Sequence, residues 1–231
     1  VKPCRTNLRS SGYRVMRSGD GDFRALLDVG SVGPSYIPGH AHAGTLSFEV
    51  AHHDRPILVD SGTSTYERCE RRSYERSTVA HNTVSVGGMD SSEVWASFRV
   101  ARRATVTIER EDADCLRASH DGYRSRLGIV HTREWVMRQH EMLVRDQLTG
   151  PRTRDFGGTA HFILQPGTEL SRIGGHHFRL NSLEVSFAGA SDVKIDDVKI
   201  SGGFNRLLDT TALHVRFRDN LETVFRQPAP S

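Results

Sequence analysis

Short apolar stretches alternate with turn signals along most of this chain. Val, Ile, Leu, Phe and Thr dominate the apolar stretches, and dipeptides such as Gly87-Gly88, Gly150-Pro151 and Gly202-Gly203 separate them. Runs of this composition between glycine and proline turns are typical of β-strands. We therefore predict strands over residues 45–51, 56–60, 81–86, 98–108, 128–137, 141–148, 160–164, 183–187, 193–200, 212–217 and 222–226.

Helical periodicity is scarce by comparison. The best helical candidate covers residues 66–76, but this segment is so rich in charge that a surface loop is an equal alternative. The regular spacing of strands and turns, with no internal repeat, favours an all-β fold built as an antiparallel sandwich with little helix.

The length of the chain indicates one folded unit. A chain of 231 residues is within the range of a single β-sandwich domain. We assign the domain to residues 13–227, with a linker-like segment over 1–12 and a tail over 228–231. Because the chain begins Val1-Lys2-Pro3 without an initiator Met or a targeting segment, we expect a fragment or a processed product.

Composition and charge exclude some classes of function. No apolar run approaches the roughly 18 residues that a membrane helix needs, so the protein is not expected to be membrane-embedded. The net charge is only +3, and the arginines are scattered rather than gathered with aromatic residues, which argues against nucleic-acid binding. An acidic sugar polymer suits this mild positive charge better.

The three cysteines add little to the functional picture. Cys4, Cys69 and Cys115 contain no C-x-x-C pair, which argues against a disulfide framework and against a thiolate zinc site. A single disulfide between two of these cysteines is still an alternative.

The densest group of candidate functional residues lies between residues 39 and 84. His40 and His42 are two positions apart, so on an extended segment both would project to the same side. Asp60 ends one predicted strand and His81 begins another, which could bring both close to the histidine pair. Two imidazoles and a carboxylate suit Zn²⁺, with a fourth position left for water or substrate. The sequence therefore predicts a metal site.

Two other interpretations of these histidines stay open. A lone histidine is usually a surface or core residue, so H-x-H alone is a weak signal. A cupin-like metal-dependent enzyme would combine the pair at 40 and 42 with Glu49 and His81. The spacing from His42 to Glu49 does not suit a cupin, however, and this alternative leaves the V-D-S-G-T segment at 59–63 unexplained.

Three segments together resemble the heparinase II/III-like polysaccharide lyases. The segments 39–42 (G-H-A-H), 59–63 (V-D-S-G-T) and 81–84 (H-N-T-V) are similar to the G-H-x-H, V-D-x-G-T and H-N-T-V segments of that family's β-sheet domain. Further along, Asp146 and Ala160-His161-Phe162 are also similar. The resemblance implies a multi-sheet, supersandwich-like antiparallel β-sandwich. Such a domain normally follows an α/α toroid, with substrate in the groove between them.

The resemblance also implies roles for individual residues. His42, Asp60 and His81 match the family's zinc ligands, whereas His40 matches a histidine that faces the substrate. Tyr66 resembles a tyrosine of alginate-cleaving members, although a tyrosine here could also simply pack under the sandwich. We therefore expect His40 and Tyr66 to be catalytic and Zn²⁺, or another divalent metal, to be structural.

One position departs from the family pattern. Members commonly read H-x-H-x-D, and Gly44 stands where that aspartate is expected. Because such outer carboxylates orient metal-bound imidazoles, the site is expected to be weakened unless Asp28 or Glu49 substitutes.

The activity that the resemblance implies is β-elimination at a uronic acid in an acidic polysaccharide. The tyrosine, histidine and asparagine that the toroid contributes have no counterpart in this sequence, so we expect the chain to need a toroid domain, in the same precursor or as a second chain, for full activity. The family context implies a periplasmic or secreted protein. The alternative is a non-catalytic carbohydrate-binding or structural module of the same fold with a structural metal.

Two further features invite a functional interpretation. Trp95 follows a polar loop and could stack on a sugar, although a tryptophan beside a strand more often packs in the core. His131 and Arg133 alternate on a predicted strand and could line the groove, or could lie on a solvated face.

Overall fold

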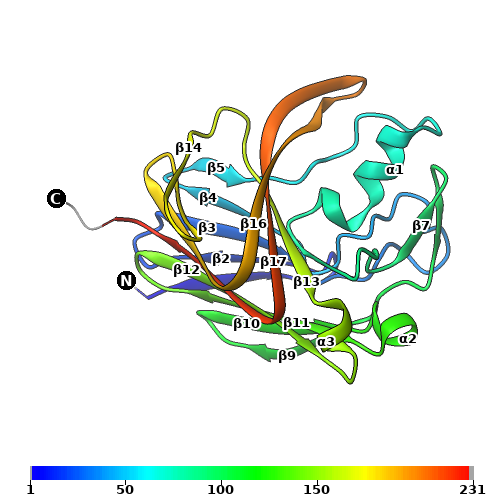
Figure 1. Cartoon of the computed structure of the whole chain (residues 1–231), viewed down its shortest axis with the longest axis horizontal. Coiled ribbons are helices and arrows are strands. Elements are labelled where there is room, and N and C mark those ends of the chain that lie inside the picture. Colours follow the sequence, from blue (N-terminus) through cyan, green and yellow to red (C-terminus); the bar gives the residue numbers. More distant parts are fainter. Residues whose placement is uncertain (1, 229–231) are drawn as a thin grey trace.

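Alternating apolar positions build the first sheet from the N-terminal quarter of the chain. In the computed structural model, which describes residues 2–228, Phe23, Ala25 and Leu27 are buried, while the residues between them are more exposed. The sheet is an antiparallel meander (Figure 1). Its strands, in order, are β1 (Cys4–Leu8), β2 (Tyr13–Arg17), β3 (Phe23–Asp28), β4 (Phe48–His52) and β5 (Arg55–Leu58).

The N-terminal segment differs from the expected domain organisation. Residues Cys4–Leu8 pair with β2 as an edge strand, so the segment 1–12 is not simply linker-like. Its Arg5 side chain also donates a hydrogen bond to the carbonyl oxygen of Asp112, which ties the edge strand to the second sheet. The expected tail lies outside the described residues beyond Pro228.

The second sheet contains ten strands and holds most of the remaining chain. Its main path runs β14-β15-β16-β17-β12-β11-β10-β9, and β13 pairs with both β17 and β6. These strands are β6 (Val84–Val86), β9 (Val106–Glu111), β10 (Cys115–His120), β11 (Val130–Met137), β12 (Glu141–Thr149), β13 (Gly158–Ile163), β14 (Leu170–Gly174), β15 (His177–Leu180), β16 (Leu183–Gly203) and β17 (Arg206–Arg226).

The two longest strands form one bent hairpin rather than four separate strands. The register of β16 against β17 shifts near Ala188, Ala190 and Ser201, which marks β-bulges. The bulges let β17 pair with β12 at its C-terminal half and with β13 at its N-terminal half. The hairpin tip extends beyond the sandwich (Figure 1). It is hydrogen-bonded to the segment after β5, since the Ser201 amide donates to the Ser61 carbonyl at 2.7 Å.

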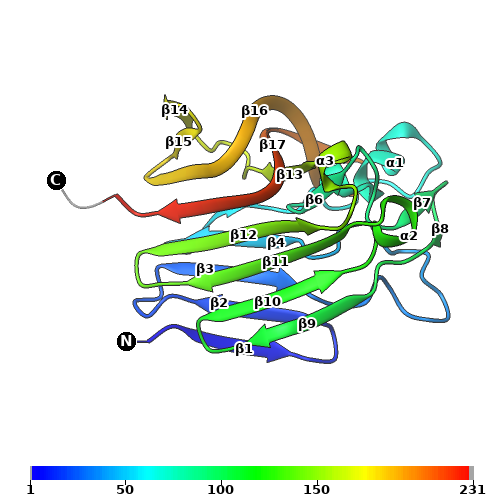
Figure 2. The same cartoon turned by 60° about the horizontal axis from the view of Figure 1, so that its bottom comes forward.

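The remaining elements gather at one end of the sandwich (Figure 2). Of the helical candidate at 66–76, only the C-terminal part is a helix. The elements are α1 (Glu70–Arg76), the 3-10 turn η1 (Thr78–Ala80), α2 (Arg124–Leu127), α3 (Thr153–Phe156) and the small sheet of β7 (Glu93–Trp95) and β8 (Arg99–Ala101).

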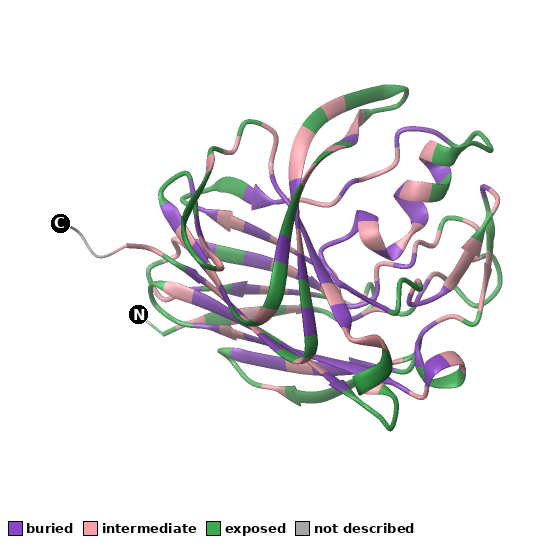
Figure 3. Ribbon diagram, in the orientation of Figure 1, coloured by how far each residue is buried: buried purple, intermediate pink, exposed green. Residues whose placement is uncertain are grey.

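A single large core fills the space between the two main sheets. Phe48 from the first sheet packs against Trp135 and Phe162 from the second, with ring centroids 6.4 and 6.3 Å apart. Buried positions concentrate along the facing strands, whereas the hairpin tip is exposed (Figure 3). The predicted antiparallel multi-sheet β-sandwich is therefore confirmed.

Two further expectations concern the membrane and the cysteines. Within residues 2–228, the helices are all too short and too polar to cross a bilayer. Cys4 and Cys69 are exposed, Cys115 is buried, and all three are free thiols.

Candidate metal and substrate site

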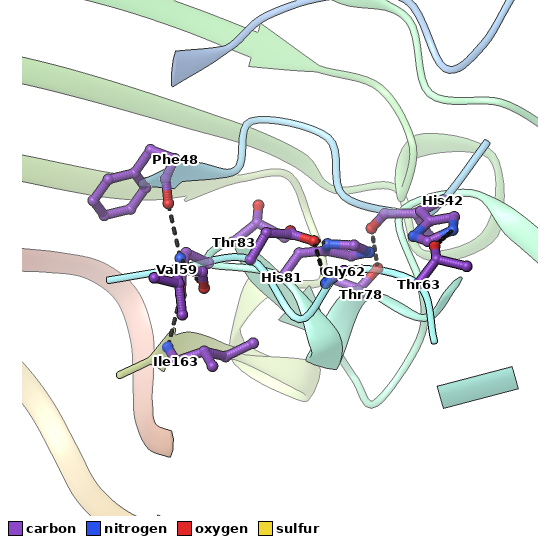
Figure 4. Close-up of polar contacts among 12 residues, drawn as sticks. His42, Phe48, Val59, Gly62, Thr63, Thr78, His81, Thr83 and Ile163 are labelled. Carbon is purple, nitrogen blue, oxygen red and sulfur yellow. Dashed lines mark hydrogen bonds and ion pairs between the residues drawn. The ribbon is translucent and has the colours of Figure 1, made fainter. Parts of the chain in front are cut away.

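Three backbone segments bring the predicted site residues to one end of the sandwich. His42 precedes β4, Asp60 follows β5, and His81 follows η1. Side-chain hydrogen bonds join these segments: the Thr78 hydroxyl donates to the Ala43 carbonyl at 2.8 Å, and the Thr83 hydroxyl donates to the Thr45 carbonyl at 2.6 Å (Figure 4). These polar residues therefore fix the loop that carries His42 to the loop that carries His81.

Asp60 and His81 form a direct pair. His81 Nδ1 lies 2.5 Å from Asp60 Oδ2, and Asp60 Oδ1 accepts a hydrogen bond of 2.8 Å from the Gly62 amide. Burial lowers the pKa of His81, but the Asp60 carboxylate outweighs burial, so the pKa is raised overall. Burial conversely raises the pKa of Asp60, and the neighbouring His81 turns the net shift downward. Both oxygens of Asp60 are thus engaged.

His42 lies beside this pair but bonds elsewhere. The ring centroids of His42 and His81 are 5.3 Å apart. Nε2 of His42 lies 3.1 Å from an Arg72 guanidinium nitrogen and 3.4 Å from the Thr63 hydroxyl. Burial, followed by the charges of His81 and Arg72, lowers the pKa of His42 to about 3. The ring is therefore a neutral imidazole, the form that binds metal.

The donor set of His42, Asp60 and His81 has the chemistry of a divalent metal site, but Asp60 would have to leave His81 Nδ1, and Arg72 would have to leave His42 Nε2, for all three to share one metal. Among residues 2–228, Nε2 of the buried His81 ring has no hydrogen-bond partner, whereas Nδ1 is held by a carboxylate, as is common for metal-binding imidazoles. As the side chains lie, no three His, Cys, Asp or Glu residues of this part of the chain form a metal-binding group.

Gly44 has a structural explanation. A Cβ atom at this position would lie 2.9 Å from Cγ of His81, which is closer than such atoms approach. The His81 ring therefore occupies the space that an aspartate side chain at 44 would need. Asp28 and Glu49, the two expected substitutes, line the same cavity as His42, Asp60 and His81.

His40 and Tyr66 meet at the surface, with Phe98 as a third member. The rings of His40 and Tyr66 are edge to face at 5.4 Å, and the Phe98 ring stacks on Tyr66 at 5.9 Å. Tyr66 is 44% exposed and Phe98 is 47% exposed. The alternative that Tyr66 packs under the sandwich is therefore wrong. We call His40, Tyr66 and Phe98 the aromatic rim.

A cavity of about 370 Å³ lies at the cluster, and His40, His42 and His81 all line it. Asp28, Glu49 and Asp60 line it, which makes its wall acidic. Burial raises the pKa of the Asp28 carboxyl and that of Glu49, because neither carboxylate has a nearby cation that offsets its desolvation fully. The cavity therefore favours cations or neutral groups over anions.

The side of the site toward α1 has the opposite charge. Arg72 and Arg76 are buried, and within residues 2–228 neither lies at ion-pair distance from a carboxylate. Arg76 donates instead to the carbonyl oxygens of Ala41, Trp95 and Ala96. The Arg72 guanidinium lies 5.2 Å from the centroid of the Tyr66 ring, directly beneath the aromatic rim. Sequence reasoning missed both arginines, although they lie in the charged segment at 66–76.

Two other residues lie elsewhere than expected. Trp95 is 51% exposed, so the preference for a core position is wrong. His131 and Arg133 line neither a groove nor a solvated face, because both side chains are completely buried.

The chain is thus a multi-sheet antiparallel β-sandwich that gathers the H-x-H, Asp and His residues beside an exposed aromatic rim. It belongs to the family described as "Heparinase II/III-like, C-terminal", which matches residues 1–227. This match confirms the resemblance that the three segments indicated. It leaves no support for the cupin-like alternative.

Solved structures show the same fold. The heparan sulfate lyase HepC from Pedobacter heparinus superposes with a TM-score of 0.75 at 16% identity over 99% of this chain and 37% of that one. A heparinase III, the BT4657 gene product, gives 0.76 at 15% identity over 97% and 36%. A chondroitin AC lyase from Streptomyces coelicolor gives 0.53 at 10% identity over 98% and 33%. Comparison with curated protein sequences finds no match.

This chain spans 36–37% of the length of the heparinase III and HepC chains that it matches. Those lyases therefore contain a further part beyond the sandwich.

Proposed function

We propose that this chain is the β-sandwich part of a lyase that cleaves uronic-acid-containing polysaccharide by β-elimination, together with an α/α toroid domain. The observation that carries the proposal is the pairing of His40 and Tyr66 on the rim, at 5.4 Å, beside the cluster of His42, Asp60 and His81. The family match over residues 1–227 supports the reaction class.

The proposed reaction places a uronate ring over the aromatic rim. A base removes the proton from C5, the C4–O4 bond breaks, a C4–C5 double bond forms, and an acid protonates the departing O4. His40 and Tyr66 are the groups on this chain that could hold or move these protons. Arg72 is buried beneath Tyr66 and, within residues 2–228, has no carboxylate at ion-pair distance. Its positive charge makes the rim electropositive, which favours an anionic substrate.

We further propose that Zn²⁺, or another divalent metal, binds His42 and His81 with Asp60 and acts structurally. When bound, the metal would hold the loops before β4 and after η1 at a fixed separation. In this proposal no proton step passes through it. From the family resemblance we also propose that the protein is periplasmic or secreted.

The decisive experiment supplies the missing half of the groove. The purified chain is mixed with acidic oligosaccharides, alone and with a heparinase III-type toroid domain, and the ultraviolet absorbance of the unsaturated uronate is followed. We expect product only with the toroid, and its loss in His40→Ala and Tyr66→Phe. Cleavage by the chain alone would contradict the requirement for a toroid.

The same experiment tests the non-catalytic alternative. The exposed Trp95 and Phe98 side chains would also suit a module that only binds sugar. Binding of an acidic oligosaccharide that His40→Ala leaves unchanged, with no cleavage even when a toroid is supplied, would favour that module over the lyase.

A further inference from the structure

A buried arginine of the second sheet connects the segments that carry the candidate metal-binding residues. Arg133 on β11 lies opposite Asp146 on β12 in the sheet register. Its guanidinium donates to both carboxylate oxygens, with distances of 2.7 and 3.0 Å, and both side chains are fully buried. Asp146 also bonds to His131 Nε2 at 2.7 Å, and His131 in turn contacts His120.

The remaining guanidinium nitrogen reaches across the core to two loops. Nη1 of Arg133 donates to the carbonyl oxygen of Leu46 at 2.8 Å and to that of Asn82 at 2.7 Å. Leu46 lies four residues after His42, and Asn82 directly follows His81. One side chain therefore holds the backbone next to both candidate metal-binding histidines.

The third segment is joined through Asn82. Its side-chain amide donates to the carbonyl oxygens of Phe48 and Val59, at 2.8 and 3.0 Å (Figure 4). Val59 directly precedes Asp60. The segments of His42, Asp60 and His81 thus converge on the pair formed by Arg133 and Asn82.

We call Arg133, with its hydrogen bonds to the carbonyl oxygens of Leu46 and Asn82, the clamp. The backbone of Leu46 indicates that the clamp holds this residue in a disfavoured conformation. Leu46 has a φ of 59°, in the left-handed region that non-glycine residues rarely adopt, and it is buried. Such a residue persists only where its surroundings hold it, and strained positions cluster at functional sites. The Arg133 guanidinium is the group that holds its carbonyl oxygen.

We propose that Arg133 is a positioning residue that fixes His42 relative to His81. The ion pair with Asp146 anchors Arg133 to the sheet. The two hydrogen bonds to Leu46 and Asn82 are additional, and they are made to the two loops whose separation decides whether His42 and His81 can share one metal.

Two variants separate the clamp from the ion pair. Arg133→Lys keeps the charge beside Asp146, but a single ammonium group cannot reach the carboxylate and both carbonyl oxygens. Arg133→Met/Asp146→Leu removes the ion pair and the clamp together without leaving an unpaired buried charge, although His131 Nε2 then loses its carboxylate partner. Arg145→Lys is the matched control, because Arg145 lies on the same sheet, is half exposed and pairs with Glu134 and Glu222.

Hydrogen exchange of the full chain provides a test that does not depend on metal. We expect both clamp variants to raise exchange about tenfold in peptides covering 40–48 and 78–86, because hydrogen bonds from a charged group are lost there. Exchange in β16 and β17 should stay unchanged, as should all exchange in Arg145→Lys. Unchanged exchange at the two loops, or an equal rise throughout the chain, would overturn the proposal.

The metal arm of the experiment rests on the proposed function. Co²⁺ is titrated into the chain and its visible absorption bands are recorded as the signature of its ligand geometry. Arg133→Lys should weaken Co²⁺ binding at least about tenfold and alter the bands, as loss of an orienting group does. If the unaltered chain bound no Co²⁺, the metal proposal would fail, whereas the exchange result would still decide the role of Arg133. Tight, spectrally unchanged Co²⁺ binding in both clamp variants would overturn that role.

Discussion

The two sides of the His42–His81 cluster carry opposite charge. On the cavity side, Asp28, Glu49 and Asp60 line one wall. On the α1 side, Arg72 and Arg76 are buried beneath the aromatic rim without a carboxylate at ion-pair distance among the described residues. The cluster therefore lies at a boundary between a negative and a positive environment, only a few side chains across.

The buried arginines of the molecule differ in the partners that surround their positive charge. Where a buried guanidinium has a bidentate carboxylate partner, as Arg133 has in Asp146, the positive charge is neutralised locally. Arg72 and Arg76 bond to carbonyl oxygens, a hydroxyl and His42 instead, so neither has a direct carboxylate partner among the described residues, although Glu75 lies near enough to act on Arg72. The proposed uronate substrate would therefore be attracted to the rim and repelled from the acidic wall.

The largest effect should come from Arg76, because it supports the α1 side by hydrogen bonds alone. Arg76→Met removes its bonds to the carbonyl oxygens of Ala41, Trp95 and Ala96. We expect a loss of about 4 kcal/mol in the free energy of unfolding, since hydrogen bonds from charged groups contribute roughly 1.5–3 kcal/mol each. Urea denaturation followed by circular dichroism measures this loss.

The matched control is Arg124→Met on the exposed surface of α2, which should change the free energy of unfolding by less than about 0.5 kcal/mol. If Arg76→Met were as mild as that control, the α1 side would not be held by its arginine.

Much of the fold was predictable because the strand signal is local. The strands predicted at 128–137 and 141–148 correspond closely to β11 (Val130–Met137) and β12 (Glu141–Thr149). The strands β1, β2 and β3 were not predicted, because arginines and an aspartate interrupt their apolar residues. It also divided β16 and β17 into four strands, because a β-bulge interrupts the alternation of side chains without ending the strand.

Only those residues of the candidate site that lie in sequence motifs were predictable. The H-x-H, V-D-x-G-T and H-N-T-V segments were enough to place His42 near His81, and the structure brings their rings to 5.3 Å. Arg72 and Phe98 were missed because their roles depend on tertiary contacts with His42 and Tyr66. No local pattern shows which of many charged residues will be buried.

A smaller effect should come from the acidic wall, and it should depend on pH. Because burial raises the folded-state pKa of Asp28, charging this carboxyl costs the folded state free energy as the pH rises above the ordinary range of aspartate. Asp28→Asn keeps the hydrogen bond from the Gly30 amide. At pH 7 we expect Asp28→Asn to raise Tm by about 2–4 °C. At pH 3, where the carboxyl is protonated in both states, the difference should vanish.

Calorimetry across this pH range, with Asp112→Asn on the exposed surface as the control, measures the effect. A gain that persists unchanged at pH 3 would show that the amide, rather than the removal of charge, stabilises the variant. The acidic wall would then carry no unfavourable charge, and the contrast between the two sides would be lost.

The smallest effect should be seen in the binding of an anionic oligosaccharide, and it should have opposite sign on the two sides. Arg72→Met removes positive charge beneath Tyr66, so binding should weaken about threefold. Asp28→Asn removes negative charge from the cavity wall, so binding should strengthen by a similar factor. Titration calorimetry with a uronic-acid oligosaccharide measures both, and a carboxyl-reduced oligosaccharide should show neither change.

Salt separates this long-range effect from direct contact. Charges that act through solvent are screened within about 8–10 Å at physiological ionic strength, so the two variants should converge on the unaltered chain as salt is added. A threefold loss in Arg72→Met that survives high salt would mean that the guanidinium touches the sugar. Equal changes of the same sign in both variants would mean that the two sides do not differ in their effect on the substrate.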